Sequence, residues 1–225
     1  MIITYLIQEF ITSLAITKSH YDWPINHDRL PHGIKICGSS YFEQNVDLKF
    51  KLHTAWKNYL ANNQEDELYN LAKYYVSTWG GVHRNSHQTL NNYIQSEPSS
   101  LILAQKQKGV ASWSKVLCIR NPEEYAIFDA RVAFTLNALQ FLASVEPKKF
   151  ISFPILPSRN GSINRATPIL CQYFLKNKIS ETNNFYQKYL SILKSAEFKD
   201  YKICELEMLL FTAAGALASK LFEKN

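Results

Sequence analysis

The sequence predicts an all-α, two-lobed helical fold, and three observations support this prediction. Glycine (7) and proline (8) are scarce among the 225 residues, unlike in a turn-rich sheet protein. Hydrophobic residues make up 46% of the chain and aromatic residues 13%, enough to fill one generous core or two small ones. Apolar residues recur at helical spacing in successive segments, without an internal repeat or a low-complexity stretch.

Capping residues and helix breakers mark the helices expected in the first half of the chain. Ser40 and Ser86 suit the position before a helix, where a side-chain oxygen accepts hydrogen bonds from free N–H groups. Pro98 suits a first helical turn, whereas the Gly80–Gly81 pair ends a helix. The expected elements are an amphipathic helix over 1–16, a loop over 19–40, and helices over about 41–60, 64–79, about 87–94 and from 98.

A helix, a tight turn, a second helix, a loop and a third helix are expected in the middle of the chain. Asn121–Pro122 breaks the second helix, because proline disfavours helical geometry at the residue before it. Asp129 begins the third, whose apolar residues keep core spacing through Leu142. An irregular stretch over 147–168 precedes two C-terminal helices, and the last, over 203–222, is apolar on most sides and therefore expected to be buried. We expect the N-terminal helix to pack beside them, which makes the lobes discontinuous in sequence.

Charge and hydropathy indicate the expected partner and location. The net charge of +6 suits a polyanionic partner such as nucleic acid, although the lysines are dispersed. The first sixteen residues lack a basic start and carry Glu9, so they do not resemble a signal peptide. No apolar run approaches the roughly 20 residues of a membrane span. We therefore expect a cytoplasmic protein with no membrane partner.

The cysteines are scattered, with no CxxC pair and no His at ligand spacing. We therefore expect buried free thiols, no metal site and no cofactor. The residues concerned are Cys37, Cys118, Cys171 and Cys204.

The stretch GVASWSKVLCIRNPEEYAIFDARVAF, residues 109–134, holds the residues best suited to chemistry. Gly109 can adopt backbone angles closed to other residues, so the chain can turn sharply and begin a helix with outward-facing N–H groups. Such a helix start attracts a phosphate, and Lys106 and Lys108 precede it. The pattern predicts a clamp that positions one strand of a DNA duplex without reading its sequence.

Two roles are open for Asp129 at the head of its helix. Aspartate is a favoured cap, and its carboxylate would accept from the N–H of Arg131 or Val132. A capping carboxylate is also held rigidly, and an ionised one beside an apolar pocket can stabilise positive charge that develops on a sugar.

The turn GVASWS followed by YAIFDARVAF resembles the helix-hairpin-helix DNA glycosylase superfamily over about residues 100–140. In that family a hairpin of Gly-apolar-Gly type grips the DNA backbone, and an Asp that opens a later helix assists cleavage of the base–sugar bond. The resemblance implies one two-lobed domain over 1–225, with the hairpin and the Asp within 100–143 and a damaged base flipped between the lobes. The implied DNA-binding residues are Lys106, Lys108, Gly109, Val110, Ala111 and Ser112, and the implied catalytic residue is Asp129.

The sequence departs from the family pattern at two places in the hairpin. Ala111 stands where the second glycine is usual, and the polar pair Gln107–Lys108 replaces an apolar-Pro pair. These departures indicate a divergent branch.

Two registers of the hairpin assign different roles to Lys115 and Trp113. With SWS as the hairpin, Lys115 falls near the nucleophilic Lys of bifunctional members, but only 14 residues then separate it from Asp129. With 109–111 as the hairpin, Trp113 takes that position and the distance to Asp129 is more natural. We prefer this register, which resembles the monofunctional alkylation-repair branch, where a Trp stacks on the extruded base and water attacks. Trp113 can equally be a core residue, and Lys115 a catalytic amine, a solvated helix residue or a phosphate contact.

Other candidates lie in two polar segments. Trp79, His83 and Arg84 surround the Gly-Gly turn, where they could stack on a base or contact a phosphate; otherwise Trp79 is core and the rest a solvated loop. Arg159 and Arg165 lie in an expected flexible loop, which suits backbone contacts or a wedge near the flipped nucleotide, or is an ordinary surface loop.

The residues and the resemblance together imply a monomeric, monofunctional DNA glycosylase. It would remove a damaged or modified base from double-stranded DNA and leave an abasic site, in repair or in defence against phage. A second interpretation is a non-catalytic helix-hairpin-helix protein that only holds a duplex, and a third is a helical scaffold in which the motif is accidental.

Overall fold

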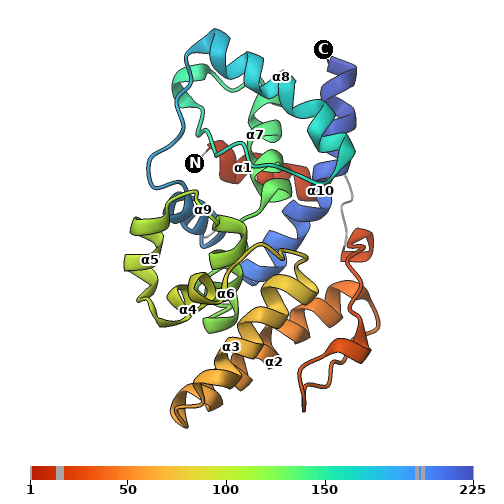
Figure 1. The fold of residues 1–225 in the computed structure, drawn as a ribbon. Helices are drawn as coiled ribbons and strands as arrows, with labels where there is room; N and C mark the ends of the chain where they lie inside the picture. Colours follow the sequence, from red (N-terminus) through yellow and green to blue (C-terminus); the bar gives the residue numbers. More distant parts are fainter. Residues whose placement is uncertain (1, 14–17, 196–197, 199–200, 225) are drawn as a thin grey trace. The chain divides into compact units, whose positions relative to one another are not determined.

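The computed structural model describes residues 2–13, 18–195, 198 and 201–224. Within these residues the chain forms ten α-helices and no strand, so the all-α prediction is confirmed (Figure 1). The chain divides into unit 1, made of Met1–His20 and Phe128–Asn225, and unit 2, made of Tyr21–Ile127. The N-terminal helix thus joins the C-terminal part of the chain, as expected.

Unit 1 is built around its last helix. Helix α10 (Ile203–Lys224) packs on α7 (Ala130–Leu142) and α8 (Gly161–Asn177), while α1 (Ile2–Ser13) packs on α7 and α9 (Phe185–Leu193). The prediction that the last helix is buried is confirmed, because most of its apolar residues are inaccessible to solvent. Short 3₁₀ turns in the same unit are η1 (Lys18–His20) and η4 (Pro147–Lys149).

Unit 2 is a separate helical core. Helix α2 (Tyr41–Ala61) packs against α3 (Glu65–Lys73) and α6 (Val110–Arg120), and α4 (His87–Gln95) also contacts α3 and α6. Helix α5 (Pro98–Gln105) precedes α6 along the chain. The unit also contains a 3₁₀ turn, η2 (His27–Arg29), and a π-helical segment, η3 (Tyr74–Trp79), which contacts α3 and α6.

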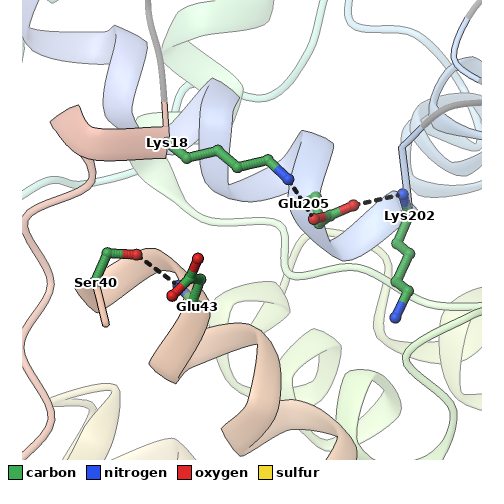
Figure 2. Close-up of polar contacts among 5 residues, drawn as sticks. All are labelled: Lys18, Ser40, Glu43, Lys202 and Glu205. Atoms are coloured by element: carbon green, nitrogen blue, oxygen red, sulfur yellow. Dashed lines mark hydrogen bonds and ion pairs between the residues drawn. The ribbon is translucent and has the colours of Figure 1, made fainter. Parts of the chain in front are cut away.

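Helices α2 and α10 each begin with a glutamate in the first turn that takes part in capping (Figure 2). In unit 2, Ser40 Oγ accepts from the Glu43 N–H at 3.2 Å, which confirms Ser40 as the predicted cap. In unit 1, Glu205 Oε2 accepts from the Lys202 N–H at 3.0 Å, and its Oε1 lies 2.9 Å from Lys18 Nζ. These contacts satisfy N–H groups that the start of a helix leaves free.

The helix expected over 64–79 changes its geometry partway. It continues from α3 into η3, after which the Gly80 N–H donates to the carbonyl of Tyr75, five residues back. The rings of Tyr75 and Trp79 stack with centroids 4.4 Å apart, and Trp79 Nε1 donates to Asn45 Oδ1 at 2.8 Å. The wider π-helical turn accommodates both contacts of Trp79.

The stretch over 147–168 is less irregular than expected. Helix α8 already begins at Gly161, because the Asn160 side chain accepts from two N–H groups of its first turn. Pro168 lies inside this helix. The loop prediction was therefore wrong from Gly161 onward, and Arg165 lies on a helix rather than in a flexible loop.

Three further expectations concern single residues and chain ends. Cys118 and Cys204 are buried and Cys171 is half-buried, but Cys37 is exposed in the loop before α2, so the expectation of a buried thiol is wrong there. Residues 1 and 14–16 of the expected first helix lie outside the described residues. Among the described helices, none combines the length and the apolar run that crossing a bilayer requires.

Candidate functional site

The turn between α5 and α6 places Lys106, Lys108 and Gly109 on one exposed bend, whereas Val110 and Ser112 are buried and Ala111 is half-buried. The Lys106 N–H still donates to the Ile102 carbonyl at 3.2 Å, and Lys106 then leaves α5 with φ +49°. Gly109 has φ +68° and ψ 16°, the left-handed region that glycine enters without steric penalty, so the predicted sharp turn is confirmed. Lys106 and Lys108 are exposed, and Val110 is the first residue of α6.

The start of α6 presents N–H groups that no described residue accepts. The N–H groups of Val110 and Ser112 donate to the carbonyls of Gln107 and Gly109, whereas those of Gln107, Gly109 and Ala111 donate to no described residue. The first turn has neither an acidic residue nor a side-chain cap. Free N–H groups, the positive end of the helix dipole and two neighbouring lysines make this bend suited to an anion.

Tyr93 and Trp113 support the bend from α4 and α6. A Cβ added at Gly109 would lie 2.5 Å from Tyr93 Oη, so this hydroxyl occupies the space that a side chain would need. Burial raises the pKa of the Tyr93 hydroxyl, which keeps it neutral. Trp113 is fully buried and its Nε1 donates to the Lys108 carbonyl at 3.1 Å. This is the environment of a core residue, and stacking of Trp113 on an extruded base stays a prediction.

Lys115 lies in α6 with only 4% of its surface exposed. Its Nζ donates to the Ala111 carbonyl at 2.6 Å, and a Cβ added at Gly80 would lie 2.5 Å from its Cε. The interpretation of Lys115 as a solvated helix residue is wrong, because the bare backbone of Gly80 leaves room for its stem to be buried. A catalytic role for Lys115 stays a prediction.

The segment after the Gly-Gly turn lies beside the start of α6. Asn85 Nδ2 donates to Ser112 Oγ at 2.9 Å, which connects this segment to the first turn of α6. The two residues before it, His83 and Arg84, are exposed, whereas Trp79 is half-buried. The structure thus brings the basic segment and the predicted clamp together within unit 2.

Asp129 begins α7 in unit 1, and its predicted capping role is confirmed. Its Oδ1 accepts from the N–H groups of Arg131 and Val132 at 2.9 and 3.0 Å. The residue is half-buried, and the Arg131 guanidinium lies 4.3 Å from the centroid of the Phe211 ring. Among the described residues, none donates a hydrogen bond to the second carboxylate oxygen. The catalytic role of Asp129 stays a prediction.

Arg159 and Arg165 are also in unit 1, and both are exposed. Arg159 directly precedes the cap of α8, and Arg165 lies in the first half of that helix. Contacts of these two side chains with DNA stay predictions.

The assignment of a function rests on the residues themselves. No protein-family model matches the sequence, and no curated protein or solved structure is significantly similar to it. The geometry offers an anion-binding bend in unit 2 and a rigidly held carboxylate in unit 1.

Sequence reasoning missed the contributions of Tyr93 and Asn85 to the bend. Asn85 is 27 residues from its partner Ser112, so no local pattern connects them. The one available signal was Gly109, because a glycine in a turn often marks a place where another group approaches the backbone closely.

Proposed function

We propose that the chain is a DNA glycosylase that hydrolyses the bond between a damaged or modified base and its sugar. The observation that carries this proposal is the start of α6, where the N–H groups of Gln107, Gly109 and Ala111 are open and lysines flank them. Such a site suits a backbone phosphate and holds DNA in position without reading its sequence. The product is an abasic site.

Asp129 is the proposed catalytic residue. Extruding a base from the duplex costs a few kcal/mol because the base must be unstacked, and this cost is lower for a damaged or modified base. The ionised carboxylate then stabilises the oxocarbenium-like sugar while water attacks. Two N–H groups already fix Oδ1, so the carboxylate needs little reorganisation during the reaction.

Water, rather than the Lys115 amine, is the proposed nucleophile. The Lys115 Nζ is buried and donates to the Ala111 carbonyl, which supports a monofunctional enzyme. Borohydride should therefore trap no covalent complex with DNA, and a trapped complex that disappears in Lys115→Met would contradict this choice.

A non-catalytic DNA-binding protein is the second candidate. Two contacts favour this candidate. Trp113 Nε1 donates to the Lys108 carbonyl in the bend, and Lys115 Nζ donates to the Ala111 carbonyl in the first turn of α6. This arrangement serves to hold a duplex even without a catalytic carboxylate.

The decisive experiment compares Asp129→Asn with the native chain on labelled duplexes that carry assorted lesions and modified cytosines. Heat or alkali should break the strand at the altered base only after treatment with the native chain. The variant should release the base about 100-fold more slowly or worse. Its DNA affinity and stability should be unchanged, because Asn caps a helix as well as Asp does. Base release at the native rate by the variant would overturn the catalytic assignment, and binding without any release by the native chain would favour the second candidate.

The clamp is tested through the salt dependence of DNA binding. Replacing Lys106 and Lys108 by Gln should lower the slope of log affinity against log salt by about 2, because each lysine releases roughly one counterion. The matched control replaces Lys51 and Lys57, two exposed lysines of α2. An equal loss in both variants would mean that the bend has no special role in holding DNA.

A further inference from the structure

Unit 2 contains a cavity that the proposed glycosylase does not use. Its volume is about 380 Å³, within the range of roughly 300–1,000 Å³ that small-molecule sites occupy. Its walls come from α2, the first turns of α3, α4 and the end of α6. None of the residues assigned to DNA binding or base release lines it.

The cavity is acidic although the protein is basic. Glu65, Asp66 and Glu97 line it, and the guanidinium of Arg120 is the opposing charge. Three carboxylates against one guanidinium give the lining a formal charge of −2 with His87 neutral, whereas the whole chain carries +6. An anionic ligand is therefore disfavoured here.

Helix ends of both kinds line the cavity. Leu60, Gln95 and Arg120 lie at or next to the last residues of α2, α4 and α6, whereas Glu65 and His87 are the first residues of α3 and α4. The partial charges of these helix ends oppose one another, so the acidic character of the cavity comes from its carboxylates.

Arg120 is already committed to the protein backbone. Its Nη1 donates to the carbonyls of Ser96 and Ile94 at 2.7 and 3.3 Å, which satisfies the end of α4. Its Cζ lies 5.9 Å from the centroid of the Trp56 ring. Burial lowers the pKa of Arg120, and the charge of Glu97 opposes this shift. Nη1 of the guanidinium is thus used by the wall itself.

The remaining wall is aromatic and rich in hydrogen-bond acceptors. The rings of Tyr69 and His87 lie with centroids 4.3 Å apart, and Lys73 Nζ lies 5.9 Å from the Tyr69 centroid. The amides of Asn63 and Asn91 also line the cavity, and their oxygens can accept from an ammonium group. An ammonium with an apolar chain matches both kinds of surface.

We propose that this cavity binds a short aliphatic polyamine. Its ammonium groups donate to Glu65, Asp66 and Glu97, and its methylene chain lies along Trp56 and Tyr69. A neutral apolar ligand would use none of the three carboxylates, which are exposed to solvent, and a bare metal ion would use none of the apolar lining. The site is independent of base release and of DNA binding by the bend.

Calorimetric titration of the whole chain with spermidine at low ionic strength tests the site. The variant Glu65→Gln, Asp66→Asn, Glu97→Gln should bind at least tenfold more weakly. The control replaces three exposed glutamates that do not line the cavity, so it changes the net charge equally and should bind within twofold of the native chain; these are Glu67, Glu123 and Glu223. Equal weakening in both variants, or no binding by the native chain at millimolar spermidine, would overturn the proposal.

A second pair of variants keeps all carboxylates in place. Gln95→Lys puts a tethered ammonium into the cavity and should weaken spermidine binding at least tenfold, whereas Gln88→Lys, outside the cavity on the same helix, should leave it unchanged. Identical affinities in the two lysine variants would refute the site. Titration with Mg²⁺ completes the test, since tighter binding of Mg²⁺ than of spermidine to the same carboxylates would replace the polyamine by an inorganic cation.

Discussion

Helices α6 and α7 begin in opposite ways, although only 20 residues separate their first residues. Helix α6 starts after Gly109, with no side-chain cap and with open N–H groups beside two lysines. Helix α7 starts after Asp129, whose carboxylate accepts from two N–H groups. The start of α6 suits a bound anion, whereas the start of α7 already contains an anion, the Asp129 carboxylate.

The same backbone feature thus serves two purposes in α6 and α7. Every helix start leaves N–H groups free, and a carboxylate or a ligand can satisfy them. Where the cap is internal, the helix gains stability and the carboxylate gains a fixed position. Where the internal cap is missing, the helix is less stable, but its free N–H groups are open to a phosphate. The proposed function uses both outcomes.

The largest expected effect is on the start of α6. Gly109→Ala should lower the free energy of unfolding by about 3 kcal/mol, because a positive φ is costly for alanine and the new Cβ meets Tyr93 Oη. Urea denaturation measures this loss. Adding Tyr93→Phe should recover part of it, since the hydroxyl is the closest atom.

Helix α8 supplies the matched control for Gly109→Ala. Gly161 also stands at a helix start, but a Cβ there meets nothing within 4 Å and its φ is not positive. Gly161→Ala should therefore be neutral or slightly stabilising. A loss as large as that of Gly109→Ala would show that the left-handed bend is not what makes α6 sensitive.

The second effect concerns the support of α6 by Lys115. Gly80→Ala should cost about 2 kcal/mol, because its Cβ would meet Lys115 Cε at 2.5 Å and the Val76 carbonyl at 2.8 Å. The double variant with Lys115→Ala should lose less stability than the sum of the single losses, since the side-chain clash is then absent. Strictly additive losses in urea denaturation would contradict the proposed packing.

The parts of the fold that the sequence predicted are those set by local contacts. Ser40 and Asp129 bond to N–H groups two or three residues further on, and Gly109 determines its own backbone angles. Such features can be predicted from a short window. The expectation of an irregular stretch over 147–168 failed at its end, because the Asn160 cap starts a helix at Gly161 that continues through Pro168.

The parts that could not be predicted depend on contacts between distant segments. The position of Tyr93 under Gly109, and the gathering of Glu65, Glu97 and Arg120 around one cavity, follow from how α3, α4 and α6 pack. The charge of each residue is visible in the sequence, but its neighbours are not. The basic bend was therefore predicted, whereas the acidic cavity was missed.

A smaller effect tests the start of α7. Asp129→Ala should lower the free energy of unfolding by about 1 kcal/mol, whereas Asp129→Asn should leave it unchanged, because the amide oxygen still accepts from the N–H groups. Urea denaturation at neutral pH distinguishes the two. If Asp129→Asn lowers the free energy of unfolding as much as Asp129→Ala does, the carboxylate stabilises the helix through its charge rather than through the two hydrogen bonds.

The smallest effect is on the start of α10, where the capping carboxylate is partly exposed. Burial raises the pKa of Glu205, but the hydrogen bonds from Lys18 and the Lys202 N–H outweigh it and hold the pKa below its ordinary value (Figure 2). The resulting stabilisation is present above the ordinary carboxyl pKa of 4.5 and is lost as the pH falls through the pKa in the folded chain. Glu205→Gln should therefore be less stable by under about 1 kcal/mol at neutral pH, and the difference should disappear in acid. Lys18→Met should reproduce part of this pH dependence, while a constant offset between native chain and Glu205→Gln at every pH would show that the carboxylate charge plays no part.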